Sequence, residues 1–140
     1  MVVTFDFDDT LLWTRVIRDE DGEYVDHVPV GQNPQIFPIL RRALQTPGVE
    51  VYVVTSRRAT GPSVKQVFDY LREWGVLEQP QFMGVRFTNG NLKADTLVQL
   101  GSVRHYDDDP EELAALPPEI KGVQAYPHPS WTQTANLGGR

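Results

Sequence analysis

Two clusters of aspartates stand at opposite ends of the chain, each directly after a short apolar segment. The first lies in VVTFDFDDTLL and the second in VRHYDDDPEEL, and together they comprise Asp6, Asp8, Asp9, Asp107, Asp108 and Asp109. Carboxylates packed together repel one another unless a cation or a shared proton neutralises them. If the fold brings the two clusters together, we expect a site of oxygen ligands suited to a hard metal ion.

Other polar residues follow apolar segments in the same way. Thr55, Ser56 and Arg57 come directly after the segment VEVYVV, and Lys93 falls in the first turn of a helix that Asn91 could cap. In parallel α/β sheets, ligands bind beyond the carboxyl ends of the strands. A cation in the first turn opposes the helix dipole, and local violations of this kind are expected at functional sites.

The elements that must position these residues alternate between strand and helix patterns, which predicts a parallel sheet covered by helices. Proline at position 62 and glycine at position 75 bound the clearest helix. The expected strands span residues 2–5, 49–54, 81–87, 103–106 and 123–126. The expected helices span residues 33–45, 62–74 and 91–100, with a further one capped by Asp109.

A β-hairpin is predicted between the first strand and the first helix. Residues 15–19 and 23–28 flank Asp21-Gly22, a favoured hairpin turn, so a flap is expected at about residues 14–29. Residues 1–126 are therefore predicted to form one domain. Residues 127–140 are rich in proline, glycine and polar residues, and we expect a flexible tail there.

The composition fits one globular domain: 140 residues, 40% hydrophobic and 23% charged. The chain has no cysteine, which excludes disulfides and thiolate chemistry. A net charge of −6 argues against a protein that coats nucleic acid. The N-terminus lacks the basic region of a secretory signal, and no apolar run approaches the roughly 20 residues of a membrane span. We therefore expect a cytoplasmic protein without a membrane partner.

Taken in order, these motifs resemble those of the haloacid dehalogenase-like (HAD) superfamily, most of whose members are Mg²⁺-dependent phosphohydrolases. The resemblance covers residues 2 to about 112. It rests on the Asp-x-Asp-x-Thr-Leu pattern from Asp6 to Leu11, the strand ending in Thr55, Lys93, and the Asp107-Asp108 pair. It implies a Rossmann-like three-layer sandwich with a central, mostly parallel sheet and a minimal cap, the hairpin flap.

The resemblance also implies roles for the site residues. Asp6 would attack phosphorus and form an aspartyl-phosphate, while Asp8 would protonate the leaving oxygen and then activate water. Mg²⁺ would be held by the Asp6 side chain, the Asp8 backbone carbonyl and Asp107, with Asp108 as a further ligand or an orienting group. Lys93 would neutralise charge on Asp6 and on the phosphoryl group. Phosphate would also contact the segment Thr55, Ser56 and Arg57.

Several neighbouring residues have simpler interpretations. Asp9 is read as a turn residue and Asp109 as a helix cap. The three histidines lack ligand spacing and are interpreted as structural: His27, His105 and His128. Trp13 and Tyr24 flank the flap, where they pack under the hairpin or stack on a base or sugar.

The segment between Thr10 and Val49 and the segment between Arg57 and Lys93 are both too short to hold a large cap domain. Capless relatives include enzymes that act on macromolecular ends. The motifs are also similar to the phosphatase domains of polynucleotide kinases. The substrate is therefore expected to be a nucleotide, a nucleic-acid terminal phosphate or a small phosphometabolite. Self-association, with a neighbouring subunit covering the site, is a further expectation. Two alternatives are a receiver-like phospho-aspartate signalling domain and a catalytically silent HAD-like binding protein.

Overall fold

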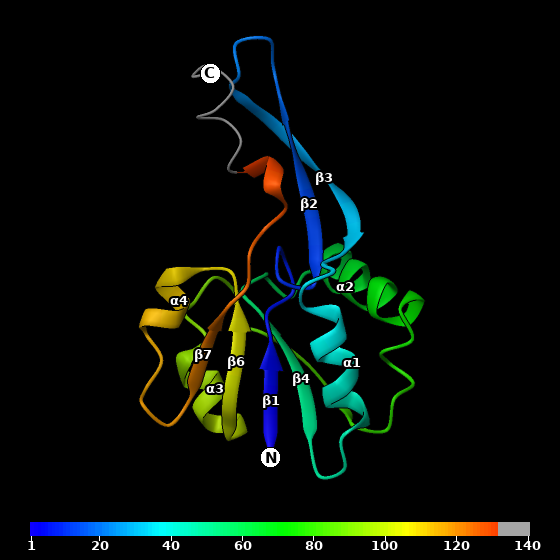
Figure 1. The fold of residues 1–140 in the computed structure, drawn as a ribbon, viewed down its shortest axis with the longest axis vertical. Coiled ribbons are helices and arrows are strands. Elements are labelled where there is room, and N and C mark those ends of the chain that lie inside the picture. The colour runs from blue at the N-terminus through cyan, green and yellow to red at the C-terminus, as the bar shows by residue number, and fades with distance from the viewer. Residues whose placement is uncertain (132–140) are drawn as a thin grey trace.

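A parallel sheet forms the centre of the computed structural model, which describes residues 1–131. In this part of the chain the sheet has five strands in the order β5-β4-β1-β6-β7, and neighbours pair in parallel (Figure 1). The strands are β1 (Val2–Phe5), β4 (Glu50–Thr55), β5 (Phe82–Phe87), β6 (Ser102–Asp107) and β7 (Lys121–Gln124). The predicted α/β class with a mostly parallel sheet is confirmed.

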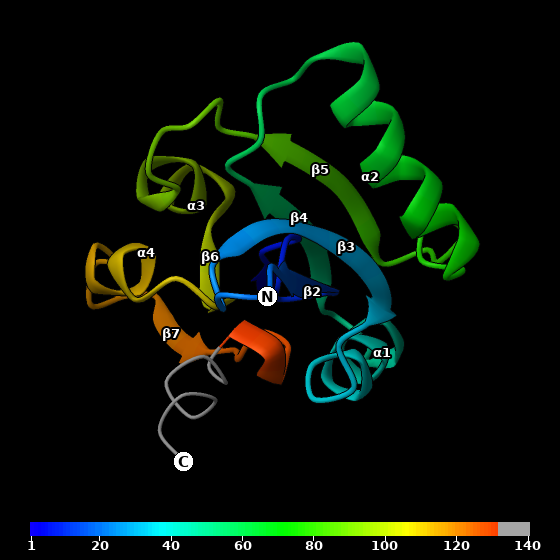
Figure 2. The same cartoon turned by 90° about the horizontal axis from the view of Figure 1, so that it is seen from above.

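Helices cover both faces of the sheet and complete a Rossmann-like three-layer sandwich. Helices α1 (Phe37–Gln45) and α2 (Gly61–Glu73) lie on one face, and α3 (Ala94–Leu100) and α4 (Pro110–Ala114) lie on the other (Figure 2). Val51 and Val53 of β4 join the core under α1 and α2, whereas Val54 packs with Leu97 of α3. Because β4 is buried on both faces, its sequence is almost continuously apolar.

The helix ends show where local signals were sufficient and where they were not. Pro62 lies in the first turn of α2, and Gly75 follows that helix with a φ of +74°, as predicted. The prediction that Asn91 caps the next helix is wrong, because α3 begins at Ala94 and Lys93 occupies its N-cap position. Likewise α1 begins at Phe37, since Asn33 uses its side chain to accept a hydrogen bond from Gln35 N in a preceding turn.

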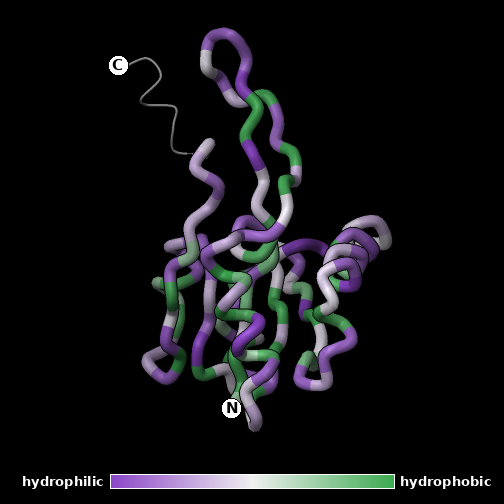
Figure 3. Tube along the Cα trace, turned by 45° about the vertical axis from the view of Figure 1, so that its right-hand side comes forward, coloured by the Kyte–Doolittle hydropathy of each residue, from purple (hydrophilic) through white to green (hydrophobic). Residues whose placement is uncertain are grey.

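The predicted hairpin is present and is longer than expected. Strands β2 (Leu12–Arg18) and β3 (Tyr24–Gln32) pair in antiparallel fashion as a separate sheet. The hairpin rises from the carboxyl edge of the central sheet, above the end of β1 (Figure 1). Figure 3 shows apolar residues along the strands of the central sheet and a mixture of apolar and polar residues along the hairpin. This hairpin is the element that was predicted as the flap.

The segment after β7 packs against the hairpin. Its short 3₁₀ helix η1 (Pro129–Trp131) places Ser130 Oγ 2.9 Å from Val16 N, and Trp131 Nε1 donates a 2.9 Å hydrogen bond to Thr14 O. Residues 127–131 therefore belong structurally with the flap and not with a separate tail. The rest of the predicted tail, residues 132–140, lies outside the described residues. None of the helices in residues 1–131 has the length and apolar character needed to cross a membrane.

Candidate active site

The two aspartate clusters meet where two central strands end side by side. Asp6 follows β1, and Asp107 is the last residue of the neighbouring strand β6. The chain moves from β1 outward to β4 and β5, then crosses back to place β6 on the other side of β1. This reversal creates a topological switch point between β1 and β6, the place where open α/β sheets bind ligands.

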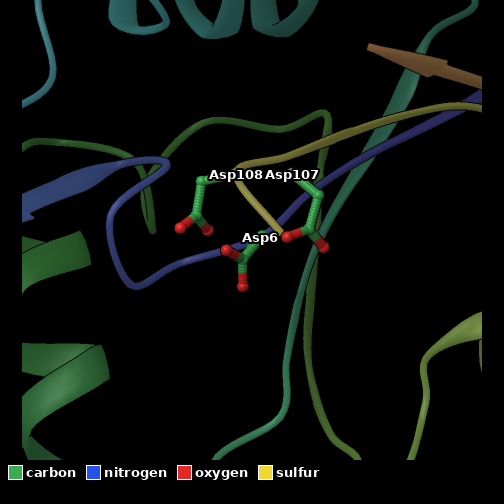
Figure 4. Close-up of side chains that lie close together, drawn as sticks. All are labelled: Asp6, Asp107 and Asp108. Atoms are coloured by element: carbon green, nitrogen blue, oxygen red, sulfur yellow. The ribbon is translucent and has the colours of Figure 1, made fainter. Parts of the chain in front are cut away.

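Three carboxylates converge at this point. Asp6, Asp107 and Asp108 each offer an oxygen atom, and these atoms lie within 4.8 Å of one another (Figure 4). Asp107 is fully buried and Asp6 is 5% exposed. The structure therefore brings together residues about a hundred positions apart in the sequence, as the interpretation of the two clusters requires.

Lys93 supplies the positive charge beside these carboxylates. Its Nζ donates hydrogen bonds to Asp107 Oδ2 at 2.8 Å and to Asp6 Oδ1 at 3.1 Å, and it lies 3.7 Å from Glu112 Oε2. Burial alone would lower the pKa of Lys93, but the charges of Asp6 and Asp107 raise it above its ordinary value. Lys93 is therefore a permanent cation, but one ammonium group cannot balance all of these carboxylates.

Thr10 fixes the other side of Asp6. Its hydroxyl is fully buried and donates to Asp6 Oδ2 at 2.9 Å, with Asp108 Oδ1 a second acceptor at 3.3 Å. Asp6 is thus held from both sides, by Lys93 on one oxygen and by Thr10 on the other. The threonine of the Asp-x-Asp-x-Thr-Leu pattern therefore has a physical role, which is to orient the first aspartate.

Burial and neighbouring charges shift the pKa values of the three carboxyl groups in different directions. Burial, together with the nearby Asp107 and Asp108, raises the pKa of Asp6 well above its ordinary value despite the opposing effect of Lys93. Burial is also the main reason that the pKa of Asp108 rises to about 6. Burial would raise the pKa of Asp107 too, but the hydrogen bond from His105 and the charge of Lys93 lower it. Three oxygen donors with excess negative charge fit a hard divalent cation such as Mg²⁺.

Asp8 lies at the rim of the site and points to a different partner. Its two carboxylate oxygens each accept a 2.8 Å hydrogen bond from the Arg57 guanidinium, through Nε and Nη2. Arg57 also donates to Gln66 Oε1 at 2.7 Å. The Asp8 side chain is therefore not one of the three grouped carboxylates. The metal contact predicted for Asp8 involves its backbone carbonyl and stays a prediction.

An open pocket of about 350 Å³ gives access to the carboxylates. Ser56 and Lys93 line it, as expected for groups that contact phosphate, but Thr55 and Arg57 do not. Thr55 is buried, and its hydroxyl oxygen accepts a 3.2 Å hydrogen bond from Arg57 N. The pocket is lined by Asp6, Asp8, Asp9, Ser56, Lys93, Asp107, Asp108, Asp109, Pro110 and Glu112.

The turn and cap interpretations of the remaining aspartates are confirmed. Asp9 has a φ of +63°, and its Oδ1 accepts a 2.6 Å hydrogen bond from the Thr14 hydroxyl. Asp109 caps α4, where its side chain accepts from Glu111 N at 2.9 Å. Trp13 packs at the base of the hairpin, donating from its indole to Tyr126 O.

Two residues contact the site in ways that were not predicted from the sequence. Glu112 lies in the first turn of α4, where it is buried, and its Oε1 accepts a 2.9 Å hydrogen bond from Lys93 N. His105 was interpreted as structural, yet its Nε2 lies 2.8 Å from Asp107 Oδ2. Residues two apart on a strand face the same side of the sheet, so the spacing of His105 and Asp107 was an available signal.

No known family model matches this sequence, and a search of curated proteins found no significant match.

Proposed function

We propose that this protein is a Mg²⁺-dependent phosphomonoester hydrolase of the HAD-like type, working through an aspartyl-phosphate intermediate. One observation carries the proposal. The Asp6 carboxylate is fixed between Lys93 and Thr10 at the sheet switch point, beside Asp107 and Asp108 and open to a pocket. A fixed carboxylate next to a cation and further oxygen ligands suits nucleophilic attack on a phosphoryl group.

In the first step, an oxygen of Asp6 attacks phosphorus while the bond from phosphorus to the leaving oxygen breaks. Asp8, at the rim, gives a proton to that oxygen, which requires that Asp8 first leave the Arg57 guanidinium and take up a proton from solvent. In the second step, Asp8 takes a proton from water, which attacks phosphorus and releases inorganic phosphate and the Asp6 carboxylate. Lys93 offsets negative charge on the phosphoryl oxygens throughout.

Asp6, Asp107 and Asp108 would hold Mg²⁺, with the Asp8 carbonyl as an additional ligand. When bound, Mg²⁺ neutralises excess negative charge and screens the phosphate from the nucleophile. This donor set supports the proposal because three carboxylates converge there beside the single ammonium group of Lys93.

The open pocket and the small hairpin favour a substrate that is either small or a chain end. A nucleotide, a nucleic-acid terminal phosphate and a small phosphometabolite all meet this requirement. A cytoplasmic location and self-association stay predictions.

The strand order weakens the receiver-like alternative. Numbered along the chain, the central strands are arranged 3-2-1-4-5, whereas doubly wound receiver folds have the order 2-1-3-4-5. A receiver would also carry its phosphorylated aspartate after the third strand, where this chain has Thr88. A catalytically silent HAD-like binding protein would have the same fold and site, so only a measurement of turnover distinguishes it from the proposed hydrolase.

The test is a phosphate-release screen with nucleoside 5′- and 3′-monophosphates, phosphorylated oligonucleotides, sugar phosphates and a generic aryl phosphate. We expect Mg²⁺-dependent release that a chelator stops. Asp6→Asn should lower turnover by at least about 10⁴-fold, because the nucleophile is lost. The matched control is Asp69→Asn on the exposed face of α2, which should retain activity. Full activity in Asp6→Asn, or release that is unchanged by the chelator, would contradict the proposal.

A further inference from the structure

His105 is a buried side chain that the proposed chemistry does not use directly. It stands on β6 two residues before Asp107, and it is fully buried. Its Nε2 lies 2.8 Å from Asp107 Oδ2. Its Nδ1 lies 2.8 Å from the hydroxyl of Thr4, the residue of β1 with which His105 is paired in the sheet. The ring is thus held at both nitrogens between the core and the site.

The direction of the first hydrogen bond follows from the partners. An ionised carboxylate can only accept, so His105 Nε2 must carry the hydrogen that points at Asp107. Nδ1 can then accept a hydrogen bond from the Thr4 hydroxyl. The Thr4 hydroxyl oxygen also lies 2.9 Å from the hydroxyl oxygen of Ser102. All of these side chains are buried. A chain of hydrogen bonds therefore runs from the core of the sheet to the carboxylate, and it fixes the orientation of the imidazole.

The two oxygens of Asp107 have different surroundings. Oδ2 accepts 2.8 Å hydrogen bonds from both Lys93 Nζ and His105 Nε2. Among residues 1–131, Oδ1 accepts one hydrogen bond, from Asp109 N at 3.0 Å. Each carboxylate oxygen has two lone pairs, so Oδ2 is saturated while Oδ1 retains one for a further partner.

We propose that His105 is a positioning residue for the metal site, holding Asp107 through Oδ2 so that Oδ1 is presented to Mg²⁺. This inference rests on the proposed function, since it assumes that Asp107 binds the metal. Lys93 alone would hold Asp107 less firmly, because its Nζ is shared with Asp6 and ends a flexible chain. Loss of a partner that orients a metal ligand typically costs about 10- to 100-fold in metal affinity.

The experiment compares two amide substitutions in the full chain, His105→Gln and His105→Asn. The glutamine amide nitrogen can reach the position of Nε2, whereas the shorter asparagine reaches only the position of Nδ1. Mg²⁺ affinity is measured by isothermal titration calorimetry, and Tm is measured without Mg²⁺. We expect His105→Asn to weaken Mg²⁺ binding about 10- to 100-fold and His105→Gln to restore most of the affinity at a similar Tm.

Unchanged Mg²⁺ affinity in His105→Asn, or equal losses in both variants, would overturn the positioning role. If the unsubstituted chain binds Mg²⁺ while His105→Asn binds it equally well, only the role of His105 fails. If the unsubstituted chain binds no Mg²⁺, the metal role in the proposed function fails as well.

A second measurement on the unsubstituted chain keeps the inference testable if His105→Asn does not fold. Nitrogen-15 NMR of the imidazoles, with His105→Gln identifying the resonance, should show a hydrogen on Nε2 of His105. That resonance should shift when Mg²⁺ is added to saturation. A hydrogen on Nδ1 alone, or a resonance that Mg²⁺ leaves unchanged, would contradict the inference.

Discussion

The buried centre and the rim pair of this site use the same side-chain types for different purposes. The buried centre consists of Asp6, Lys93, Asp107 and Asp108, and the rim pair consists of Asp8 and Arg57. Lys93 is 4% exposed and is surrounded by more carboxylates than it can neutralise, whereas Asp8 is 39% exposed and is matched by a single guanidinium. The buried centre therefore has a charge deficit that a cation can fill, while the charges of the rim pair are already balanced and Asp8 is accessible to solvent.

The sharpest test of this division is Asp8→Asn. Asparagine keeps the shape and one acceptor oxygen but cannot carry a proton between leaving group and water. We expect turnover to fall about 10²- to 10⁴-fold, as for the loss of a general acid–base group. Mg²⁺ affinity, measured by calorimetry, should change little, because the Asp8 side chain is not one of the three grouped carboxylates.

Asp69→Asn on α2 is the matched control, since it changes an exposed aspartate paired with Lys65. A large loss of Mg²⁺ affinity in Asp8→Asn would mean that the Asp8 side chain also binds the metal, and the division between the buried centre and the rim pair would be wrong.

Removing the cation of the buried centre should lower stability as well as turnover. In Lys93→Met the stem is retained, but buried Asp6 and Asp107 lose their positive partner. Breaking a buried ion pair from one side typically costs about 3–5 kcal/mol. Urea unfolding without Mg²⁺ should show a decrease of this order, and saturating Mg²⁺ should recover part of it.

The exposed pair of Lys65 with Asp69 provides the contrast for this measurement. Lys65→Met should change the free energy of unfolding far less than Lys93→Met, because exposed ion pairs contribute little. Equal effects of Lys65→Met and Lys93→Met would mean that burial of Lys93 carries no energetic weight.

Local sequence signals were enough to predict most of the fold and part of the buried centre. The apolar run of β4, the proline and glycine that bound α2 and the Asp21-Gly22 turn each determine their element within a few residues. Parallel strands place their carboxyl ends at one edge, so Asp6 and Asp107 could be expected to meet. Their order with Lys93 then suggested the chemistry.

Contacts between side chains distant in sequence could not be predicted in the same way. Helix α3 begins at Ala94 and not at the predicted residue 91, and Lys93 N before it donates a hydrogen bond to Glu112, nineteen residues later. The pairing of Arg57 with Asp8 spans 49 positions and depends on side-chain conformations that periodicity does not specify. Such choices are set by packing and charge in the folded chain.

The burial of these carboxyl groups also predicts how stability depends on pH. Burial raises the folded-state pKa of Asp6 and Asp108 above their ordinary values, for Asp108 from 3.8 to about 6. A raised acid pKa stabilises the fold at pH below 3.8, and this contribution is lost as the pH rises through about 6. Asp107 has the opposite dependence, because its pKa is lowered and its contribution is lost as the pH falls below 3.8.

In urea unfolding of the metal-free chain, the contribution of Asp6 and Asp108 to the free energy of unfolding should therefore decline between about pH 4 and pH 7. Saturating Mg²⁺ should flatten that decline by neutralising the carboxylates. Asp108→Asn, which removes one titrating group, should also flatten it. A decline that neither Mg²⁺ nor Asp108→Asn alters would place its origin outside the buried centre.

Arg57→Lys should have the smallest effect and tests what the rim pair contributes. Lysine keeps the positive charge but loses the planar fork that holds both oxygens of Asp8, as well as the stacking of the guanidinium over Phe7 at 5.3 Å. Stability should change by at most about 1 kcal/mol, as expected for a partly exposed pair. Turnover should fall less than in Asp8→Asn, because Asp8 can still exchange protons when it is less firmly oriented. If Arg57→Lys instead loses as much turnover as Asp8→Asn, Arg57 must act on the reacting phosphate itself, and the rim pair would be two catalytic residues instead of one oriented by the other.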